Sequence, residues 1–213
     1  MHMKKPLIIL LFSLISATTF AQSRFGVKVG GNMANIKFGE TLPGVELKSI
    51  FTPQAGLVYY SNLSKPLFVQ TGLLFNQKGT SMNIDDPIVS AFFGDSKIKV
   101  TYSFVELPIN VGYQIPVGDN FAIAPFVGGF VGYAVMGKAK IGSITYDLFD
   151  DEEAEDLISA KDRLDYGVNA GLGFHIGKRL IISGQYSHGL ANLSDEDPKV
   201  NTQTITAGLT FLF

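Results

Sequence analysis

Charged and amide side chains are the first candidates for chemistry in this sequence. They lie in segments where apolar residues alternate with polar residues or glycine. They share the face of their segments that otherwise carries glycine and polar residues. An unpaired charge in a narrow interior is costly, so we expect a polar network with Lys78 or Lys138 as possible further partners. A structural role is favoured over a proton or ion relay. The predicted members are Lys28, Glu106, Asn110, Asn169 and Gln185.

Histidines give the only hint of an enzyme. His188 adjoins Ser187, and Asp165 begins the neighbouring segment, so a hydrolase at the rim of a barrel would have to use these groups together with acidic loop residues. Adjacent strand residues point to opposite faces, however, so Ser187 and His188 cannot readily share a proton. His175 is expected far away, at the other end. Polar residues at a membrane interface are the favoured interpretation, and no catalytic residue is assigned.

Two further patterns are poor indicators of ligand binding. The segment Gly132 to Ala139 (GYAVMGKA) nearly matches a phosphate-binding loop, but Ala139 lacks the hydroxyl that would hold Mg²⁺ and no helix follows. Between Asp147 and Asp156, seven of ten residues are acidic. This run could bind Ca²⁺ or bridge to lipopolysaccharide phosphates, yet it lacks the spacing of an EF-hand and is typical of a solvated loop. No cofactor or metal site is expected.

The elements that would position these residues are eight segments with a period of two. Each is near or above the roughly 9 to 11 residues that a tilted strand needs to cross a membrane. Connections after the second, fourth and sixth segments are short, and the others are longer and polar. This layout predicts an all-β, eight-stranded antiparallel up-and-down transmembrane barrel, with both chain ends on the short-turn, periplasmic side. The segments are 25–37, 50–62, 67–80, 100–115, 121–138, 164–176, 180–192 and 201–213.

Alternation does not by itself show whether the apolar face points outward to lipid or inward to a core. An outward face is favoured because the unlike charges Lys28 and Glu106 share the glycine-rich face, and because all eight segments are long. A soluble periplasmic barrel with an apolar, ligand-binding interior is the alternative. Segment 121–138 is apolar on both faces and cannot be oriented. A few apolar residues do not fit this division into an apolar face and a glycine-rich polar face: Val58, Tyr60, Leu74, Phe126 and Phe130.

The beginning of the chain predicts export. A basic start, the apolar run LIILLFSLI and a small-residue exit are typical of a signal peptide over residues 1–21, with cleavage after Ala21. Residues 22–213 would form one barrel domain. They retain 15 basic and 19 acidic residues, a net charge of −4, which argues against nucleic acid as a partner. The chain has no cysteine, so disulfides and thiolate metal sites are excluded.

The whole predicted domain resembles the outer-membrane β-barrel family of Bacteroidota often called porin family or PorT-like. The matching segments are FGVKVGGNMANI, YSFVELPINVGYQI, FAIAPFVGGFVGY, DYGVNAGLGF, QYSHGLANL and ITAGLTFLF. The resemblance implies an eight-stranded outer-membrane barrel with no agreed reaction. Expected partners are outer-membrane lipid, lipopolysaccharide and, through the C-terminal strand ending at Phe213, the barrel assembly machinery. An extracellular ligand is not identified.

A non-enzymatic role is therefore predicted, with the longer loops used for structural or interaction purposes outside the cell. Eight strands leave an interior just wide enough for side chains, so no wide pore is expected. The alternatives are a rim-located lipid or peptide hydrolase and a narrow solute channel.

Overall fold

The computed structural model describes residues 23–38, 45–84, 97–142, 144–149, 163–192 and 200–213. Most of these residues form strands, and each strand is antiparallel to its neighbours. The strands are β1 (Ser23–Phe38), β2 (Val45–Ser64), β3 (Leu67–Ile84), β4 (Lys97–Tyr113), β5 (Ile115–Gly118), β6 (Phe121–Ile141), β7 (Ile144–Asp147), β8 (Leu164–Ile176), β9 (Leu180–Gly189) and β10 (Val200–Leu212).

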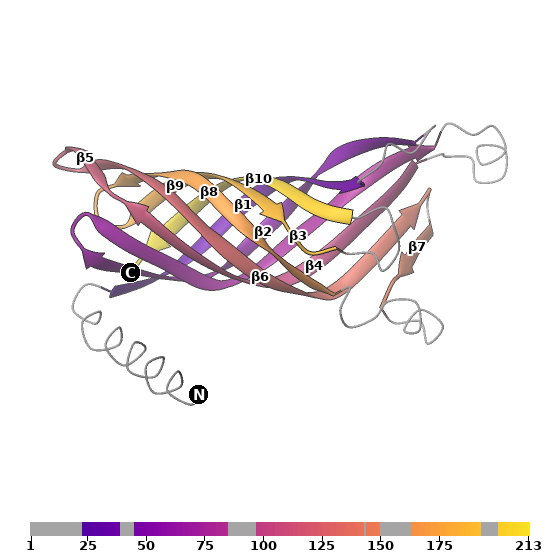
Figure 1. Cartoon of the computed structure of the whole chain (residues 1–213), viewed down its shortest axis with the longest axis horizontal. Helices are drawn as coiled ribbons and strands as arrows, with labels where there is room; N and C mark the ends of the chain where they lie inside the picture. Colours follow the sequence, from indigo (N-terminus) through magenta and orange to yellow (C-terminus); the bar gives the residue numbers. More distant parts are fainter. Residues whose placement is uncertain (1–22, 39–44, 85–96, 143, 150–162, 193–199) are drawn as a thin grey trace, which may run out of the picture.

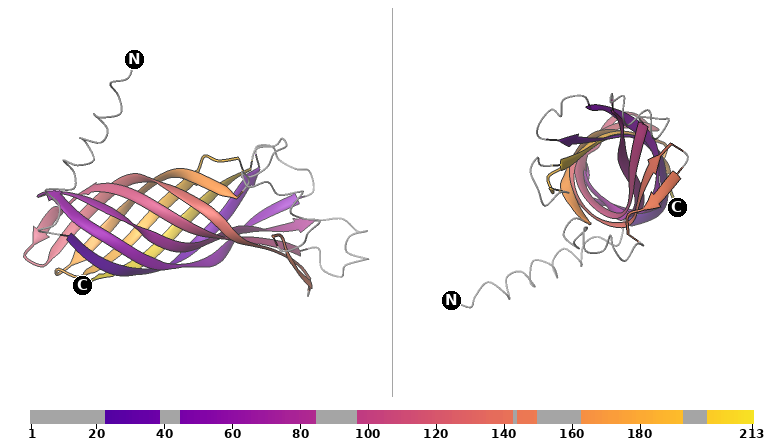
Figure 2. Two further views of the ribbon diagram at one scale, coloured as in Figure 1. Left: turned by 90° about the horizontal axis from the view of Figure 1, so that it is seen from below. Right: turned by 90° about the vertical axis from the view of Figure 1, so that its right-hand side faces the viewer.

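Eight of the described strands close a ring. Each pairs with the next in the order β1, β2, β3, β4, β6, β8, β9 and β10, and β10 pairs again with β1. The closing seam runs from Gly26 opposite Leu212 to Phe38 opposite Val200. Figures 1 and 2 show the tilted strands from the side and the ring from its end. The predicted all-β, eight-stranded antiparallel up-and-down barrel is confirmed.

Two short strands differ from the prediction. β5 continues β4 beyond Gln114 and pairs with the start of β6, so the predicted segment 100–115 ends in a separate hairpin arm. Pro116 lies in this arm, where a missing backbone donor is tolerated at an edge. β7 pairs with the far end of β6, beyond the ring, at the end opposite the C-terminus (Figure 1).

The short connections lie together at one end of the barrel. Turns at Lys65 and Pro66, at Asp119 and Asn120, and around Gly177 join the strands there. Gly177 has a φ of +61°, a left-handed conformation that favours glycine. The backbone N–H of Phe213 donates to the carbonyl of Phe25, so the last residue also belongs to this end. Most of the acidic run, Asp150 to Asp156, lies outside the described residues.

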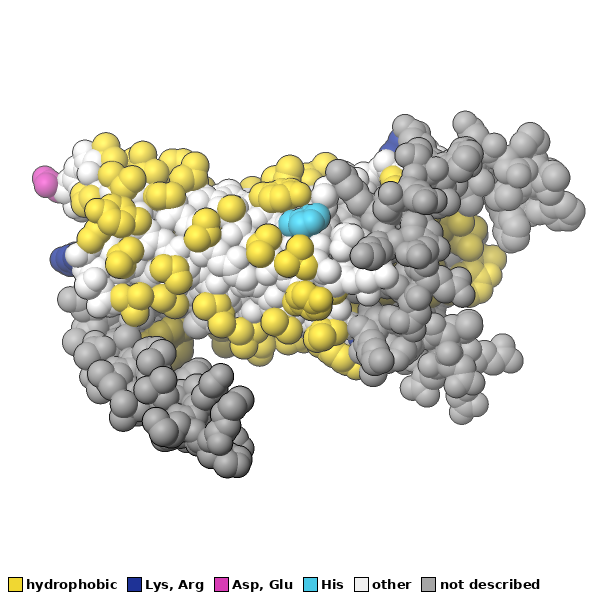
Figure 3. Space-filling view, in the orientation of Figure 1, with side chains coloured by type: hydrophobic (Ala, Val, Ile, Leu, Met, Phe, Trp, Pro, Cys, Tyr) yellow, Lys and Arg dark blue, Asp and Glu magenta, His cyan; other side chains and the backbone are white. Residues whose placement is uncertain are grey.

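Side chains along the strands alternate between the interior of the barrel and an apolar exterior. Along β10, Thr204, Thr206 and Thr210 are buried, whereas Ile205 and Leu209 between them are exposed. The face seen in Figure 3 carries hydrophobic side chains along the strands and charged ones at the barrel's ends. The apolar face therefore points outward, as predicted. Within the described residues, no helix has the length and apolarity needed to cross a bilayer.

β6, the strand that the sequence could not orient, follows the same rule until a bulge. Phe126 and Phe130 point inward, while Val127 and Val131 are exposed. The register with β4 then shifts by one residue, so that Val135 is extra and Gly137 becomes buried. The segment resembling a phosphate-binding loop lies within this strand, and the structure gives it no helix that could cradle a phosphate.

Candidate functional site

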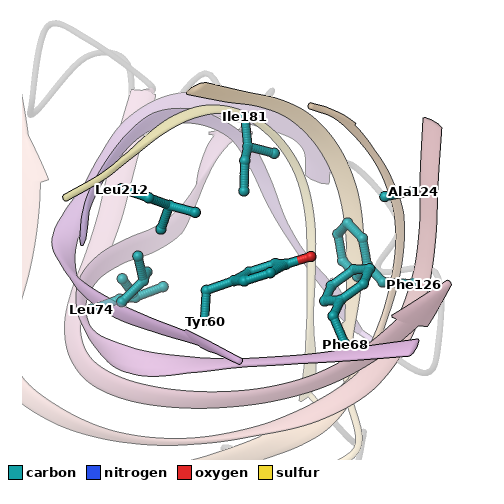
Figure 4. Packing of buried hydrophobic residues seen from close by; sticks show 8 residues of the cluster. Tyr60, Phe68, Leu74, Ala124, Phe126, Ile181 and Leu212 are labelled. Atoms are coloured by element: carbon teal, nitrogen blue, oxygen red, sulfur yellow. The ribbon is translucent and has the colours of Figure 1, made fainter. Parts of the chain in front are cut away.

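The half of the interior nearest the short turns is filled by an apolar plug. Figure 4 shows its side chains converging inside the ring. The rings of Tyr60 and Phe68 stack with centroids 4.9 Å apart. Most of the apolar residues that broke the sequence rule belong to this plug, because they fill the lumen instead of facing lipid. Its members are Val58, Tyr60, Phe68, Leu74, Ala124, Phe126, Ile181 and Leu212.

A buried ion cluster lies in the other half of the lumen. Nζ of Lys78, on β3, is 2.9 Å from Oε2 of Glu106 on β4 and 3.0 Å from Oδ2 of Asp165 on β8. Each of the three residues is at most 1% exposed. The cluster thus joins the neighbouring strands β3 and β4 to β8, which pairs with neither of them. One ammonium shared by two carboxylates forms charge-assisted hydrogen bonds in a site with little water.

Aromatic and polar groups complete the surroundings of Lys78. Its ammonium lies 3.9 Å from the ring centroid of Phe130 and 5.2 Å from that of Phe104, in cation–π geometry. The Thr202 hydroxyl donates to Oδ2 of Asp165 at 2.9 Å. Lys78 is therefore held by rings as well as by carboxylates, which fixes its position across the lumen.

A chain of amides extends the cluster around the barrel. Nδ2 of Asn76 donates to Oε2 of Glu106 at 3.0 Å, and Nδ2 of Asn32 donates to Oδ1 of Asn76 at 2.7 Å. The Thr206 hydroxyl then donates to Oδ1 of Asn32 at 2.8 Å. The network connects β4, β3, β1 and β10, and so it spans the seam that closes the ring.

The five residues predicted for the lumen are all buried, but they are not one network. Asn169 donates to Oδ1 of Asn110 at 3.3 Å, and Gln185 donates to the Ser187 hydroxyl at 2.9 Å. Lys28 interacts electrostatically with Glu106. Among the described ion pairs, however, Glu106 is joined to Lys78.

Asp165 is the member of the ion cluster that the sequence analysis did not place there. The sequence does put it on the polar face of its segment, with Gly167 and Asn169, but it was not counted as a member of the network. Lys138, offered as a possible partner, is exposed on β6. The four charged residues among the buried described side chains are Lys28, Lys78, Glu106 and Asp165, two of each sign.

The groups considered for hydrolysis do not meet. His188 is opposite the exposed Val168 in the sheet, and its Nδ1 lies 3.4 Å from Nε2 of Gln203. Asp165 is completely buried on the inner side of the wall. Paired strand residues share a face, so His188 and Asp165 lie on opposite sides. The described residues contain no cluster of three or more His, Asp or Glu side chains suited to a metal ion.

An aromatic lid covers the end of the lumen opposite the short turns. Phe149, just after β7, packs with the inward-facing Phe104 and Ala134. The backbone N–H of Leu148 donates to the Gly137 carbonyl at 2.8 Å, which folds this segment onto β6. Arg163 lies 4.2 Å above the Phe149 ring. The described interior is thus filled in three layers: plug, polar middle and lid.

Comparison with known proteins agrees with this architecture. The model of a family described as "Outer membrane protein beta-barrel domain" matches residues 7–213. The fold is similar to that of Neisserial surface protein A (TM-score 0.50, 10% identity, covering 89% of this chain and 97% of that one). Ail, the attachment invasion locus protein of Yersinia pestis (TM-score 0.46, 14% identity, 90% and 99%), and OprG from Pseudomonas aeruginosa (0.46, 12%, 90% and 94%) also match. No curated protein matches the chain. At these identities the likeness concerns the fold.

Proposed function

Because the chain belongs to the family of outer-membrane proteins with a β-barrel domain, we propose that it is a non-enzymatic barrel that acts through its longer loops. Family membership confirms the predicted location in the cell outer membrane. The finer proposal is a structural or interaction role outside the cell, with lipid and lipopolysaccharide around the wall and the barrel assembly machinery engaging the strand that ends at Phe213.

The filled lumen is the observation that carries this proposal. A path for solutes would have to pass the stacked Tyr60 and Phe68, the ion cluster at Lys78, and the lid at Phe149. These barriers come from different strands and are packed against the wall. Eight strands leave an interior just wide enough for such side chains. We infer that the barrel presents its surfaces and does not form a wide pore.

Purified protein inserted into planar bilayers is expected to show no steady, large conductance, because side chains fill the lumen at three levels. Single-channel recording of the folded protein is the measurement, and the same detergent without protein is the control. Steady openings of nanosiemens size would contradict the plugged interior, and small discrete openings would favour the narrow solute channel.

A hydrolase at the rim is the alternative of another class, and the geometry gives it little support. His188 does not share a side of the wall with Asp165 or Ser187. The acidic loop residues that were the other candidates lie mostly outside the described residues. Nucleophilic catalysis needs a nucleophile and a base within hydrogen-bonding reach. Loss of a detected lipid or peptide hydrolase activity in a His188→Gln variant would reject the non-enzymatic proposal.

Export is proposed to follow from the first 21 residues, which lie outside the described residues. A short apolar run behind two lysines is a secretory signal, and cleavage after Ala21 leaves Gln22 as the first residue. We place the chain among the PorT-like barrels of Bacteroidota on the segments that resemble them, with the short turns facing the periplasm. Sequencing the N-terminus of protein taken from outer membranes tests the cleavage, and a first residue other than Gln22 would contradict it.

A further inference from the structure

The short-turn end of the barrel contains a cavity that lies outside the apolar plug. Its volume is about 290 Å³, and it is lined by residues of β1, β2, β5, β6, β8 and β10 and of the short turns between strands. We call this cavity the vestibule. Tyr60 and Leu212, two members of the apolar plug, lie at its inner side. A molecule that enters it therefore meets a closed floor.

The vestibule carries an excess of positive charge. Arg24, Lys65 and Lys178 line it, and Asp119 is the one acidic side chain among its described lining residues. Arg24 donates from one guanidinium nitrogen to the Lys178 carbonyl, which holds it at the mouth. A guanidinium has five N–H donors in a planar fork that matches a carboxylate or phosphate. Within the described part of the chain, the bond to Lys178 uses one donor of Arg24, so most of its donors are left for a ligand.

Neutral donors lie beside these charges. Nε2 of Gln114 donates to the Tyr60 hydroxyl oxygen at 2.7 Å and lies 3.4 Å from Nδ1 of His175. When an amide N–H₂ donates to both, the Tyr60 O–H and Nε2–H of His175 are left as donors. Tyr60 is only 3% exposed, and Arg24 interacts electrostatically with both Tyr60 and His175. The buried side of the vestibule thus offers hydrogen-bond donors next to cations.

We propose that the vestibule binds a small oxyanion with two negative charges, either a phosphate monoester or a dicarboxylate. The charge follows from three cations against one carboxylate, and the oxyanion from the guanidinium fork and the neutral donors. The volume admits an anionic group with a small organic remainder. The closed floor means that the ligand is bound and does not pass through. This site is separate from the loops at the other end, so it does not depend on their role.

Titration of the folded, full-length barrel in a zwitterionic detergent tests this proposal, with inorganic phosphate and succinate as probes and NMR chemical shifts as the readout. Both should bind saturably. Arg24→Gln is expected to weaken binding by about tenfold or more, since a charge-assisted pair is removed. Tyr60→Phe, which removes a single hydroxyl, should weaken it by a smaller factor while the plug stays packed.

Arg179→Gln is the matched control, because Arg179 is exposed in the same turn as Lys178 and does not line the vestibule. The affinity of this variant for each probe should stay within about twofold of that of the unchanged protein, as expected for an exposed charge. If Arg24→Gln does not fold, Lys178→Gln takes its place. Tighter phosphate binding assigns the monoester class, and tighter succinate binding assigns the dicarboxylate. Equal weakening by the control, or no saturable binding of either probe, would overturn the proposal.

Discussion

Substitution of Lys78 by methionine is expected to lower the free energy of unfolding by about 3 to 5 kcal/mol, because it leaves two buried carboxylates without their cation. Glu106 and Asp165 would then share the lumen as like charges with almost no exposure to water. Methionine keeps the length of the side chain and can still contact the rings of Phe104 and Phe130. The loss of stability therefore measures the removal of the charge and not the creation of a cavity. Urea unfolding in detergent micelles measures it.

Two controls separate this effect from a general loss of lysine. In the variant that combines Lys28→Met, Lys78→Met, Glu106→Gln and Asp165→Asn, none of the four buried charges remains, so most of the stability should return. Lys99→Met removes an exposed lysine from β4 and should change the free energy of unfolding by no more than about 0.5 kcal/mol. If Lys78→Met alone is as stable as the unchanged protein, the ion cluster does not stabilise the barrel.

An arginine in place of Leu209 is expected to cost about 2 to 4 kcal/mol of folding free energy in a bilayer, as charged residues do near the middle of the lipid-facing wall. Leu209 is 47% exposed on β10, between Val29 of β1 and Ile182 of β9. It lies in the closing seam, where its partner Val29 is near the middle of β1. Refolding into lipid vesicles measures the cost through the fraction that migrates as folded barrel on unboiled gels.

Leu190→Arg supplies the matched comparison. Leu190 is 51% exposed, like Leu209, but it directly follows β9 at the end opposite the short turns. An arginine near the interface costs only about 0 to 1 kcal/mol because its charge reaches water. Equal effects of the two substitutions, or better folding of Leu209→Arg in plain buffer, would contradict a lipid-facing wall.

The barrel could be predicted because successive side chains of a strand point to opposite faces. Alternation of apolar and polar residues in the sequence therefore shows which side chains are buried. Thr204, Ile205 and Thr206 on β10 already alternate in the sequence as they do in the barrel. The short turns were equally visible, since Pro66 and Gly177 interrupt the pattern where the chain reverses. Local signals of this kind determine the number of strands and the direction of their faces.

The ion cluster could not be predicted in full because it depends on relations between distant strands. Glu106 and Asp165 lie on β4 and β8, with β6 between them, and only the register of three pairings brings both to Lys78. The bulge at Val135 was also hidden, since one extra residue leaves no mark in a strand that is apolar on both faces. The vestibule was missed for the same reason, because its lining comes from six strands.

The pairing of β1 with β10 has a consequence for how the molecule is made. β1 finds its second neighbour only when the far end of the polypeptide arrives, so contacts of very long sequence separation must form before the ring exists. Until then, a row of unpaired N–H and C=O groups lies along β1 and cannot enter hydrocarbon at acceptable cost. Insertion strand by strand is disfavoured. The chain therefore stays outside the bilayer until the ring can close, and its unpaired strand edge is prone to aggregation. A chaperone would have to protect this edge.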